Sequence, residues 1–315
     1  MDDVTWTILD MLVRDAGLPA VTATSRLVGR GLDNRIYAAR LADGHQVVLR
    51  LRADQATAET TRARLLQSYG LPVPRLLAAD GNASLYEFAP GITMGEAVED
   101  WTATPNSWAL VGRAYRQVHD IRFPRLLAGE VGPDGISLRP VDPVTPLHEA
   151  VDGATVGLER LLPNTVALLP QIHHLIEAAA PSLRGSTTAL LHGDPNLGNI
   201  LIAPDRATLV DWDGPVIGDP ARELAQLDEH ALLFNGQGLP RAFYDGYGRG
   251  PIEPNTSLHR LIGMLSWLTS HAWSDFERLD PDLRARTRGW FHVLLAWVAR
   301  LPEHVARLRT LPARP

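Results

Sequence analysis

The chain has 315 residues and a formal net charge of −6. It contains no lysine, so all 30 residues counted as lysine plus arginine are arginine, and it also contains no cysteine. The absence of lysine excludes enzymes that form a Schiff base on a protein amine, and it excludes the G-x-x-x-x-G-K-[ST] phosphate loop. The absence of cysteine excludes thiol nucleophiles, disulfides and thiolate metal sites, and the acidic balance argues against a nucleic-acid partner.

No targeting or membrane segment is visible in the sequence. The start, Met1-Asp2-Asp3, is acidic and lacks an apolar core region. No apolar run reaches the roughly 18 residues that a spanning helix needs. We therefore expect a cytoplasmic protein that does not bind membranes, and its length favours two domains or one large one.

Residues 1–89 predict a small unit of β-sheet with one main helix. In residues 46–52, QVVLRLR, apolar and polar side chains alternate, which is typical of a strand. The turn signal Asp43-Gly44 comes before it, and a Gly-containing turn interrupts an earlier strand pair. The elements expected here are a hairpin over 26–41, a strand over 46–52, a helix over 54–69 and a strand over 84–88.

Residues 90–315 predict a second, mostly helical unit. Apolar side chains recur at helical spacing over 108–118, and residues 122–146 are rich in proline and glycine, which favours a loop. A short strand over 208–210 runs into Asp211, and residues 221–309 are again helical in pattern. Between them, residues 191–221 hold five acidic residues and one arginine, and such clusters face solvent or hold a cation.

The acidic segment contains a pattern suited to phosphoryl transfer. It begins with LHGDPNLGNIL, in which Asp194 and Asn199 lie in a polar stretch between apolar flanks. Asp211 follows twelve residues later, in LVDWD, and returning strands would bring the three side chains together. Oxygens of Asp and Asn are hard ligands that suit Mg²⁺, and a further carboxylate can accept a proton from a hydroxyl.

The pattern HGDxxxxN, an apolar strand and DWD resembles the aminoglycoside phosphotransferase and choline kinase superfamily, which shares the protein-kinase fold. The resemblance covers residues from about 24 to 248. It implies an α+β, bilobal fold with a small antiparallel-sheet N-lobe and a large, mostly helical C-lobe. The catalytic loop would lie within residues 190–221, in the C-lobe.

The resemblance also implies a role for each residue of the loop. Asp194 matches the catalytic Asp that orients the acceptor hydroxyl and accepts its proton, and Asn199 and Asp211 match the Mg²⁺ ligands. His192 and Asp219 match residues that support the loop. An N-cap of the helix that begins near Ala221 is an equally good explanation of Asp219.

The nucleotide side of the site matches less closely. Gly29, Gly31 and Asn34 resemble the phosphate loop of the family, although a lone G-x-G is often only a hairpin. The hinge that grips the base through backbone groups matches residues 85–91, with Glu87 and Ala89 supplying those groups. ATP and GTP therefore remain equally compatible as phosphate donors.

In this family the third strand normally supplies a lysine that binds the α- and β-phosphates. Arg50 stands in the matching place, and the planar guanidinium can bind phosphate through two hydrogen bonds. Arg52 shares its face of the strand and is the competing choice. Glu59 matches the Glu that pairs with the strand cation.

The acceptor pocket is expected between the catalytic loop and the C-terminal helices. Residues 222–315 carry 12 arginines and 10 acidic residues, a balance that favours a neutral or anionic acceptor over a polycationic aminoglycoside. An aromatic cage would instead favour choline. The candidate acceptor-binding residues are Asp213, Asp228, Trp267, Trp273 and Asp275. Asp213 could also approach the metal or remain solvated.

The leading interpretation is a Mg²⁺-dependent O-phosphotransferase that moves the γ-phosphate of ATP or GTP to a hydroxyl of a small molecule. An antibiotic of nucleoside, macrolide or aminoglycoside type is the preferred acceptor. A metabolite kinase for choline, homoserine or a sugar is the alternative, and a nucleotide-binding pseudokinase scaffold is a remote one. The sequence determines neither the acceptor nor the oligomeric state.

Overall fold

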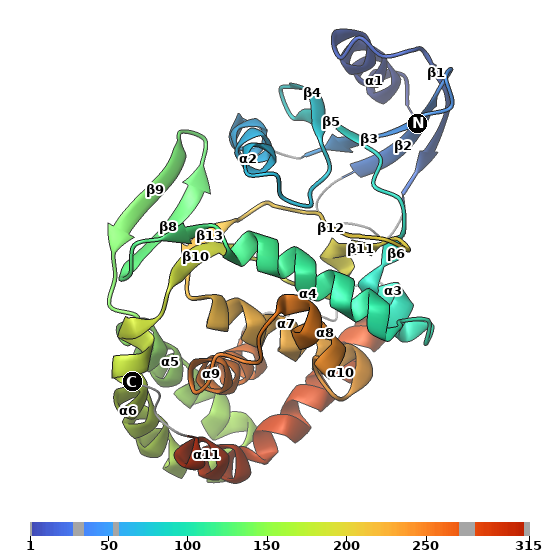
Figure 1. The fold of residues 1–315 in the computed structure, drawn as a ribbon. Coiled ribbons are helices and arrows are strands. Elements are labelled where there is room, and N and C mark those ends of the chain that lie inside the picture. Colours follow the sequence, from blue (N-terminus) through green and yellow to red (C-terminus); the bar gives the residue numbers. More distant parts are fainter. Residues whose placement is uncertain (1, 28–34, 53–56, 271–280, 312–315) are drawn as a thin grey trace.

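The computed structural model describes residues 2–27, 35–52, 57–270 and 281–311. They form an α+β structure of two lobes, a small one that contains the N-terminal sheet and a larger, mostly helical one (Figure 1). In the part of the chain that the structure describes, no helix is long and apolar enough to cross a membrane.

The small lobe is built on an antiparallel sheet with the strand order β1-β2-β3-β5-β4. Its elements are α1 (Asp3–Asp15), β1 (Val21–Arg26), β2 (Arg35–Leu41), β3 (Gln46–Leu51), α2 (Thr57–Ser68), β4 (Leu76–Asp80) and β5 (Ala83–Glu87). The expected alternation in β3 is present: Val47, Leu49 and Leu51 are buried, whereas Val48 and Arg50 are less so. Leu9 and Leu12 of α1 pack into the same core, so this lobe has a helix beyond the one that the sequence predicts.

The larger lobe consists of helices around two small sheets. Its helices are α3 (Met94–Glu99), α4 (Pro105–His119), α5 (Thr145–Leu161), α6 (Leu169–Gly185), α7 (Pro220–Asn235), α8 (Arg241–Tyr247), α9 (Asn255–Thr269), α10 (Pro281–Ala299) and α11 (Leu301–Thr310), with the 3₁₀ helices η1 (Pro163–Leu168) and η2 (Leu197–Asn199). One sheet has the order β7-β10-β13-β8-β9 and the other β12-β11-β6. Their strands are β6 (Ile92–Thr93), β7 (Arg122–Phe123), β8 (Leu127–Gly132), β9 (Gly135–Pro140), β10 (Thr188–Leu191), β11 (Ile200–Ile202), β12 (Ala207–Leu209) and β13 (Val216–Gly218).

The loop predicted over residues 122–146 is wrong, because β8 and β9 form a hairpin there with Gly132 paired to Gly135. The sequence Gly-Pro-Asp-Gly between them is a turn signal with a physical basis, since proline presets its own φ and glycine accepts a positive one. Gly135 indeed has a φ of 105°. Composition alone favoured a loop, whereas the short apolar runs on either side of the turn mark two strands.

Two glycines let α4 and α8 cross at close range. A Cβ built on Gly112 would lie 2.1 Å from the carbonyl oxygen of Phe243, and one on Gly246 would lie 2.1 Å from that of Ala109. Only glycine permits backbones to approach so closely. This contact fixes α4, whose last residues reach the catalytic loop.

The β5–β6 segment connects the lobes. Glu87 ends β5 in the small lobe, and Thr93 of β6 pairs with Leu201 of β11 in the large one. Gly91 lies between them with a φ of 125°, and a Cβ there would meet the carbonyl oxygen of Ile202 at 2.2 Å. The connection therefore runs directly over the strand that follows the catalytic loop.

Candidate active site

The polar stretch between β10 and β11 holds Asp194 and Asn199 close together. Asn196 caps η2 by accepting the N–H of Asn199, and this cap sets the course of the loop. The Nδ2 of Asn199 donates to Oδ2 of Asp194 at 2.8 Å, and the Nδ2 of Asn196 donates to the same oxygen at 2.9 Å. The Asp194 side chain is thus oriented by two amides while the residue itself stays exposed.

Asp211 lies two residues after the end of β12, next to the residue that bonds to Asn199. The N–H of Val210 donates to the carbonyl oxygen of Asn199 at 2.9 Å, which joins the two segments. Asp211 has a φ of 64°, a left-handed conformation that is costly for a residue other than glycine and that occurs mainly where function or packing demands it. The segments that carry Asp194, Asn199 and Asp211 therefore lie next to each other in the large lobe.

The catalytic loop is anchored from below by a carboxylate to which the sequence reading gave no role. Glu223 of α7 is 1% exposed and accepts the N–H of His192 at 3.1 Å and that of Gly193 at 2.9 Å. Its Oε2 also lies 2.8 Å from Nε2 of His119, whose Nδ1 lies 2.8 Å from the hydroxyl of Tyr247. Burial opposes ionisation, but the hydrogen bond and charge of His119, the charge of His192 and the N–H of Gly193 together outweigh it and lower the pKa of Glu223. A charged, fully buried carboxylate thus holds the loop backbone.

His192 and Asp219, the two residues expected to support the loop, act in different places. The Nε2 of His192 donates to the carbonyl oxygen of Val210 at 2.9 Å, and its ring lies 4.3 Å from that of Trp212. Asp219 instead accepts the N–H of Ala221 at 2.9 Å and so caps α7. Oδ1 of Asp219 faces its own helix and Oδ2 faces Asn255 and His259 of α9, whereas Glu223, one turn later, points at the loop.

Gly193 permits a second close approach inside the site. Its φ is 90°, and a Cβ there would lie 2.0 Å from the carbonyl oxygen of Gly214. The loop before Asp194 and the turn after Asp213 are therefore packed backbone to backbone.

A cluster of opposite charges joins β3 to the Asp211 turn. The Nη2 of Arg50 lies 2.6 Å from Oδ1 of Asp211 and 2.7 Å from Oδ2 of Asp213. The Nη1 of Arg50 lies 3.4 Å from Oε1 of Glu59, the pair that the resemblance implies. The Nη1 of Arg52 lies 2.5 Å from Oδ1 of Asp213. Arg50 and Arg52 are thus both directed toward the carboxylates of the large lobe.

The residues expected to bind the nucleotide base and phosphates are only partly visible. Gly29, Gly31 and Asn34 lie outside the described residues. The N–H of Glu87 donates to the carbonyl oxygen of Arg75 at 2.9 Å, and its carboxylate pairs with the Arg75 side chain on the surface. Ala89 lies two residues later, in the segment that joins the lobes.

The candidate acceptor residues do not form one group. Asp228 is buried in α7 and pairs with Arg260 of α9, and its Oδ1 accepts the N–H of Leu239 at 2.7 Å. Trp267 of α9 packs at 5.1 Å, between ring centroids, from His230 of α7. Trp273 and Asp275 lie outside the described residues, and Asp213 belongs to the charge cluster.

His230 is a neighbour of the catalytic loop that no motif signals. Burial lowers its pKa to about 4, and the negative charge of Asp194 opposes this shift. The imidazole is therefore neutral near pH 7, and it lies close enough to Asp194 to sense its charge.

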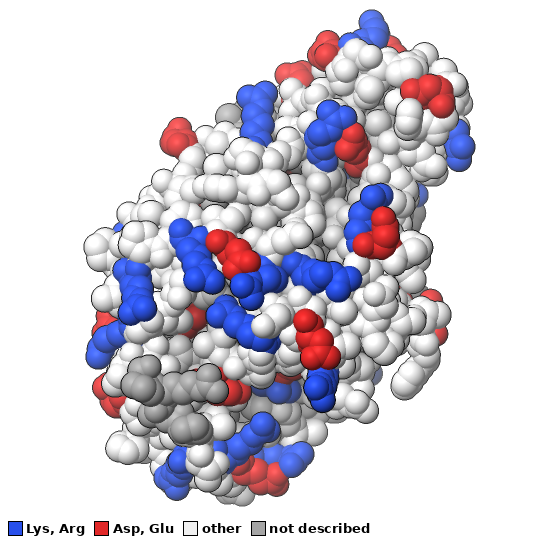
Figure 2. Space-filling view, viewed as in Figure 1, with Lys and Arg blue, Asp and Glu red and all other residues white. Residues whose placement is uncertain are grey.

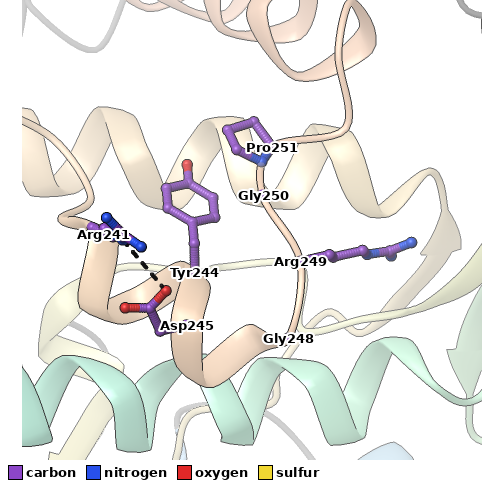
Figure 3. A pocket seen from close by; sticks show the side chains of 7 residues that line it. All are labelled: Arg241, Tyr244, Asp245, Gly248, Arg249, Gly250 and Pro251. Carbon is purple, nitrogen blue, oxygen red and sulfur yellow. Dashed lines mark ion pairs between the residues drawn. The ribbon is translucent and has the colours of Figure 1, made fainter.

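A surface cavity of about 540 Å³ lies elsewhere, along α8 and the segment that follows it. It is lined by Arg241, Tyr244, Asp245, Gly248, Arg249, Gly250 and Pro251 (Figure 3). Arg241 is paired with Asp245, and Arg249 extends away from Tyr244, so the polar groups do not converge on one point. On the face that contains α4 and α8, acidic side chains are interspersed among the arginines (Figure 2). We assign no substrate to this cavity.

The metal chemistry of the site would depend on few protein ligands. Within the described ranges, no group of three or more His, Asp or Glu side chains is arranged to hold a metal ion. Mg²⁺ in phosphoryl-transfer sites is held by one or two protein oxygens together with phosphate oxygens and water. Asn199 and Asp211 offer such a pair. The buried Nε of Arg50, which has no hydrogen-bond partner among the described residues, is a donor that a phosphate oxygen would satisfy.

Comparison with known proteins gives a consistent result. The sequence model of the phosphotransferase enzyme family, APH, matches residues 24–262. No curated protein matches the sequence.

Several solved structures share the fold. The aminoglycoside phosphotransferase APH(4)-Ia is 17% identical, with a TM-score of 0.61 over 92% of this chain and 99% of that one. A choline/ethanolamine kinase family protein from Mesorhizobium loti is 21% identical, with a TM-score of 0.59 over 91% and 92%. The ADP-bound aminoglycoside phosphotransferase APH(2'')-Ib is 15% identical, with a TM-score of 0.57 over 93% and 97%.

Proposed function

Because the chain belongs to the phosphotransferase enzyme family, we propose that it transfers the γ-phosphate of ATP or GTP to a hydroxyl group of a small molecule, with Mg²⁺ as cofactor. The observation that carries this proposal is that the Asp194 loop, the Asp211 turn and Arg50 of the small lobe lie close together. Asp194 is exposed and fixed by two amides, the N–H of Val210 joins the Asp211 segment to Asn199, and Arg50 reaches Asp211 from the other lobe.

Each residue then has one task in the transfer. Asp194 orients the acceptor hydroxyl toward the phosphorus and accepts its proton as the new O–P bond forms. Asn199 and Asp211 would hold Mg²⁺, which supplies positive charge to the phosphate oxygens. Arg50 binds phosphate oxygens through its planar guanidinium, and the nucleoside diphosphate leaves with the bonding electrons.

The site also explains how an arginine can replace the usual strand lysine. Glu59 is 4% exposed and pairs with Arg50, and the hydroxyl of Tyr86 donates to the same Oε1 at 2.6 Å. This second contact fixes the carboxylate that holds the guanidinium. Arg50 is thereby directed toward the large lobe, where the phosphates would lie.

For the acceptor we propose an antibiotic, with a neutral or anionic one preferred. Fold neighbours of this chain include APH(4)-Ia, one of whose structures is a ternary complex with AMP-PNP and hygromycin B. The net charge of +2 on residues 222–315 disfavours polycations, and the neutral His230 and Trp267 beside the loop offer apolar and hydrogen-bonding surface. Fold alone hosts many acceptors, so this choice depends on the site.

A metabolite kinase is the second candidate. The neighbour from the choline/ethanolamine kinase family is 21% identical, and Trp267 could contribute a cation–π contact to a quaternary ammonium group. Both candidates share the same reaction and differ only in the acceptor.

The test is transfer of label from [γ-³²P]ATP or [γ-³²P]GTP with Mg²⁺ to a panel of antibiotics, choline, homoserine and sugars. We expect labelled product with at least one antibiotic. Transfer to choline or homoserine alone would assign the enzyme to primary metabolism. Nucleotide binding without transfer to any hydroxyl compound would favour the scaffold alternative.

A further inference from the structure

The two carboxylates after β12 differ in their partners. Asp211 faces Arg50, whereas Asp213 lies between two arginines and uses one oxygen for each, Oδ2 for Arg50 at 2.7 Å and Oδ1 for Arg52 at 2.5 Å. The side chains of Arg50 and Arg52 are only 11% and 15% exposed. The side chain of Asp213 is 37% exposed, so these ion pairs are shielded from solvent mainly on the arginine side.

Arg52 and Asp213 belong to different lobes. Arg52 directly follows β3 of the small lobe, and Asp213 lies in the turn between β12 and β13 of the large one. The same turn is packed against the catalytic loop through Gly193 and Gly214. A force between Arg52 and Asp213 therefore acts between the nucleotide lobe and the catalytic loop.

A third arginine completes the cluster. Arg62 of α2 has a buried Nε with no hydrogen-bond partner among the described residues. Burial lowers the pKa of Arg62. The negative charge of Asp213 opposes this shift, and the positive charge of Arg52 adds to it. The small lobe thus directs three positive charges at the Asp213 side of the interface.

The proposed reaction requires Arg50 to change partners. When Arg50 binds phosphate, it must leave Asp211 and Asp213, and Asp211 must turn to the metal. A half-buried carboxylate left without a partner is strongly unfavourable, but Asp213 keeps Arg52. The Arg52 contact therefore remains intact while Arg50 and Asp211 exchange partners.

We infer that the Arg52–Asp213 ion pair is a latch between the lobes that holds β3 over the catalytic loop and so positions Arg50 for phosphate. Arg52 and Asp213 are positioning residues in this account, rather than a phosphate ligand and a metal or acceptor ligand. The inference deepens the proposed function and depends on it for the role of Arg50, although the latch itself exists without nucleotide.

The first experiment measures the latch directly in nucleotide-free protein. The chain has no cysteine, so Val4→Cys on α1 and Val156→Cys on α5 introduce the two thiols to which spin labels attach. Val4 is 71% exposed and Val156 is 76% exposed, so both positions accept a label. Double electron–electron resonance should show a narrow distance distribution, which Arg52→Ala and Asp213→Ala broaden. The exposed Arg14→Ala is the matched control and should leave the distribution unchanged. Arg52→Lys keeps a positive charge at this position, so its distribution should be nearly as narrow as that of the wild type. Equal widths for all variants would refute the latch, whatever reaction the enzyme catalyses.

The second experiment is a double-mutant cycle on nucleotide affinity, measured by isothermal titration with AMP-PNP and without acceptor. Arg52→Ala and Asp213→Ala should each weaken binding by about tenfold, and Arg52→Ala should add less than about threefold in the Asp213→Ala background. A full second loss in that background would show that Arg52 binds phosphate itself. A loss in Asp213→Ala that appears only with Mg²⁺ would show that Asp213 is a metal ligand.

Discussion

The buried carboxylate of Glu223 gives the sharpest stability prediction. It accepts hydrogen bonds from two loop N–H groups and contacts the ring of His119, all within 3.1 Å. Each hydrogen bond to a charged group contributes about 1.5–3 kcal/mol, and breaking a buried charge pair costs about 3–5 kcal/mol. Because the three contacts share one carboxylate, their losses are not additive, and we expect Glu223→Ala to lower the free energy of unfolding by about 3–5 kcal/mol.

The assay is urea unfolding followed by tryptophan fluorescence at neutral pH. Glu223→Gln keeps an acceptor for the loop but loses the charge, so it should cost about 1–3 kcal/mol. Since the pKa of Glu223 is below its ordinary value of 4.5, the wild type should lose this contribution as the pH falls through the lowered pKa, and Glu223→Gln should not.

The exposed Glu303→Ala is the control and should leave the unfolding midpoint unchanged. A loss of less than about 1 kcal/mol in Glu223→Ala would contradict the anchoring role.

Three further predictions follow from buried or close-packed positions. Burial raises the pKa of Glu229 well above its ordinary value of 4.5, so its contribution to stability is full below that value and is lost as the pH rises above it. Glu229→Gln should flatten this part of the pH dependence, and an unchanged slope would count against the prediction. Gly246→Ala places a Cβ 2.1 Å from a backbone carbonyl of α4 and should lower the free energy of unfolding by at least about 2 kcal/mol. Gly153→Ala, on an open helix surface, should instead raise it by about 0.5–1 kcal/mol, and thermal unfolding measures both changes. Gly193→Ala should reduce turnover at least about tenfold by displacing the loop before Asp194, and wild-type kinetics would show that the loop tolerates the shift.

The sequence predicts the fold class well, and it groups the candidate site residues of the large lobe in one short stretch, because both features depend on local patterns. Asp194, Asn199 and Asp211 lie within eighteen residues, and each stands beside a short apolar strand that fixes its place. The family and the bilobal fold are confirmed by the match over residues 24–262 and by the fold neighbours.

What the sequence does not show depends on contacts between distant segments. The Glu223–His119–Tyr247 chain joins residues more than a hundred positions apart, and nothing local marks its members. The role of Asp213 likewise emerges only when β3 of the other lobe is placed above it. The N-cap role of Asp219 is local, by contrast, and is one of the two explanations that the sequence offers for it.

The central claim is that Asp194 accepts the proton of a small-molecule hydroxyl during phosphoryl transfer. Single-turnover transfer from [γ-³²P]nucleotide, compared between wild type and Asp194→Asn, tests it most directly. The account predicts that the rate of transfer falls by orders of magnitude while the dissociation constant of AMP-PNP changes by less than about threefold. Unchanged transfer by Asp194→Asn would contradict the account.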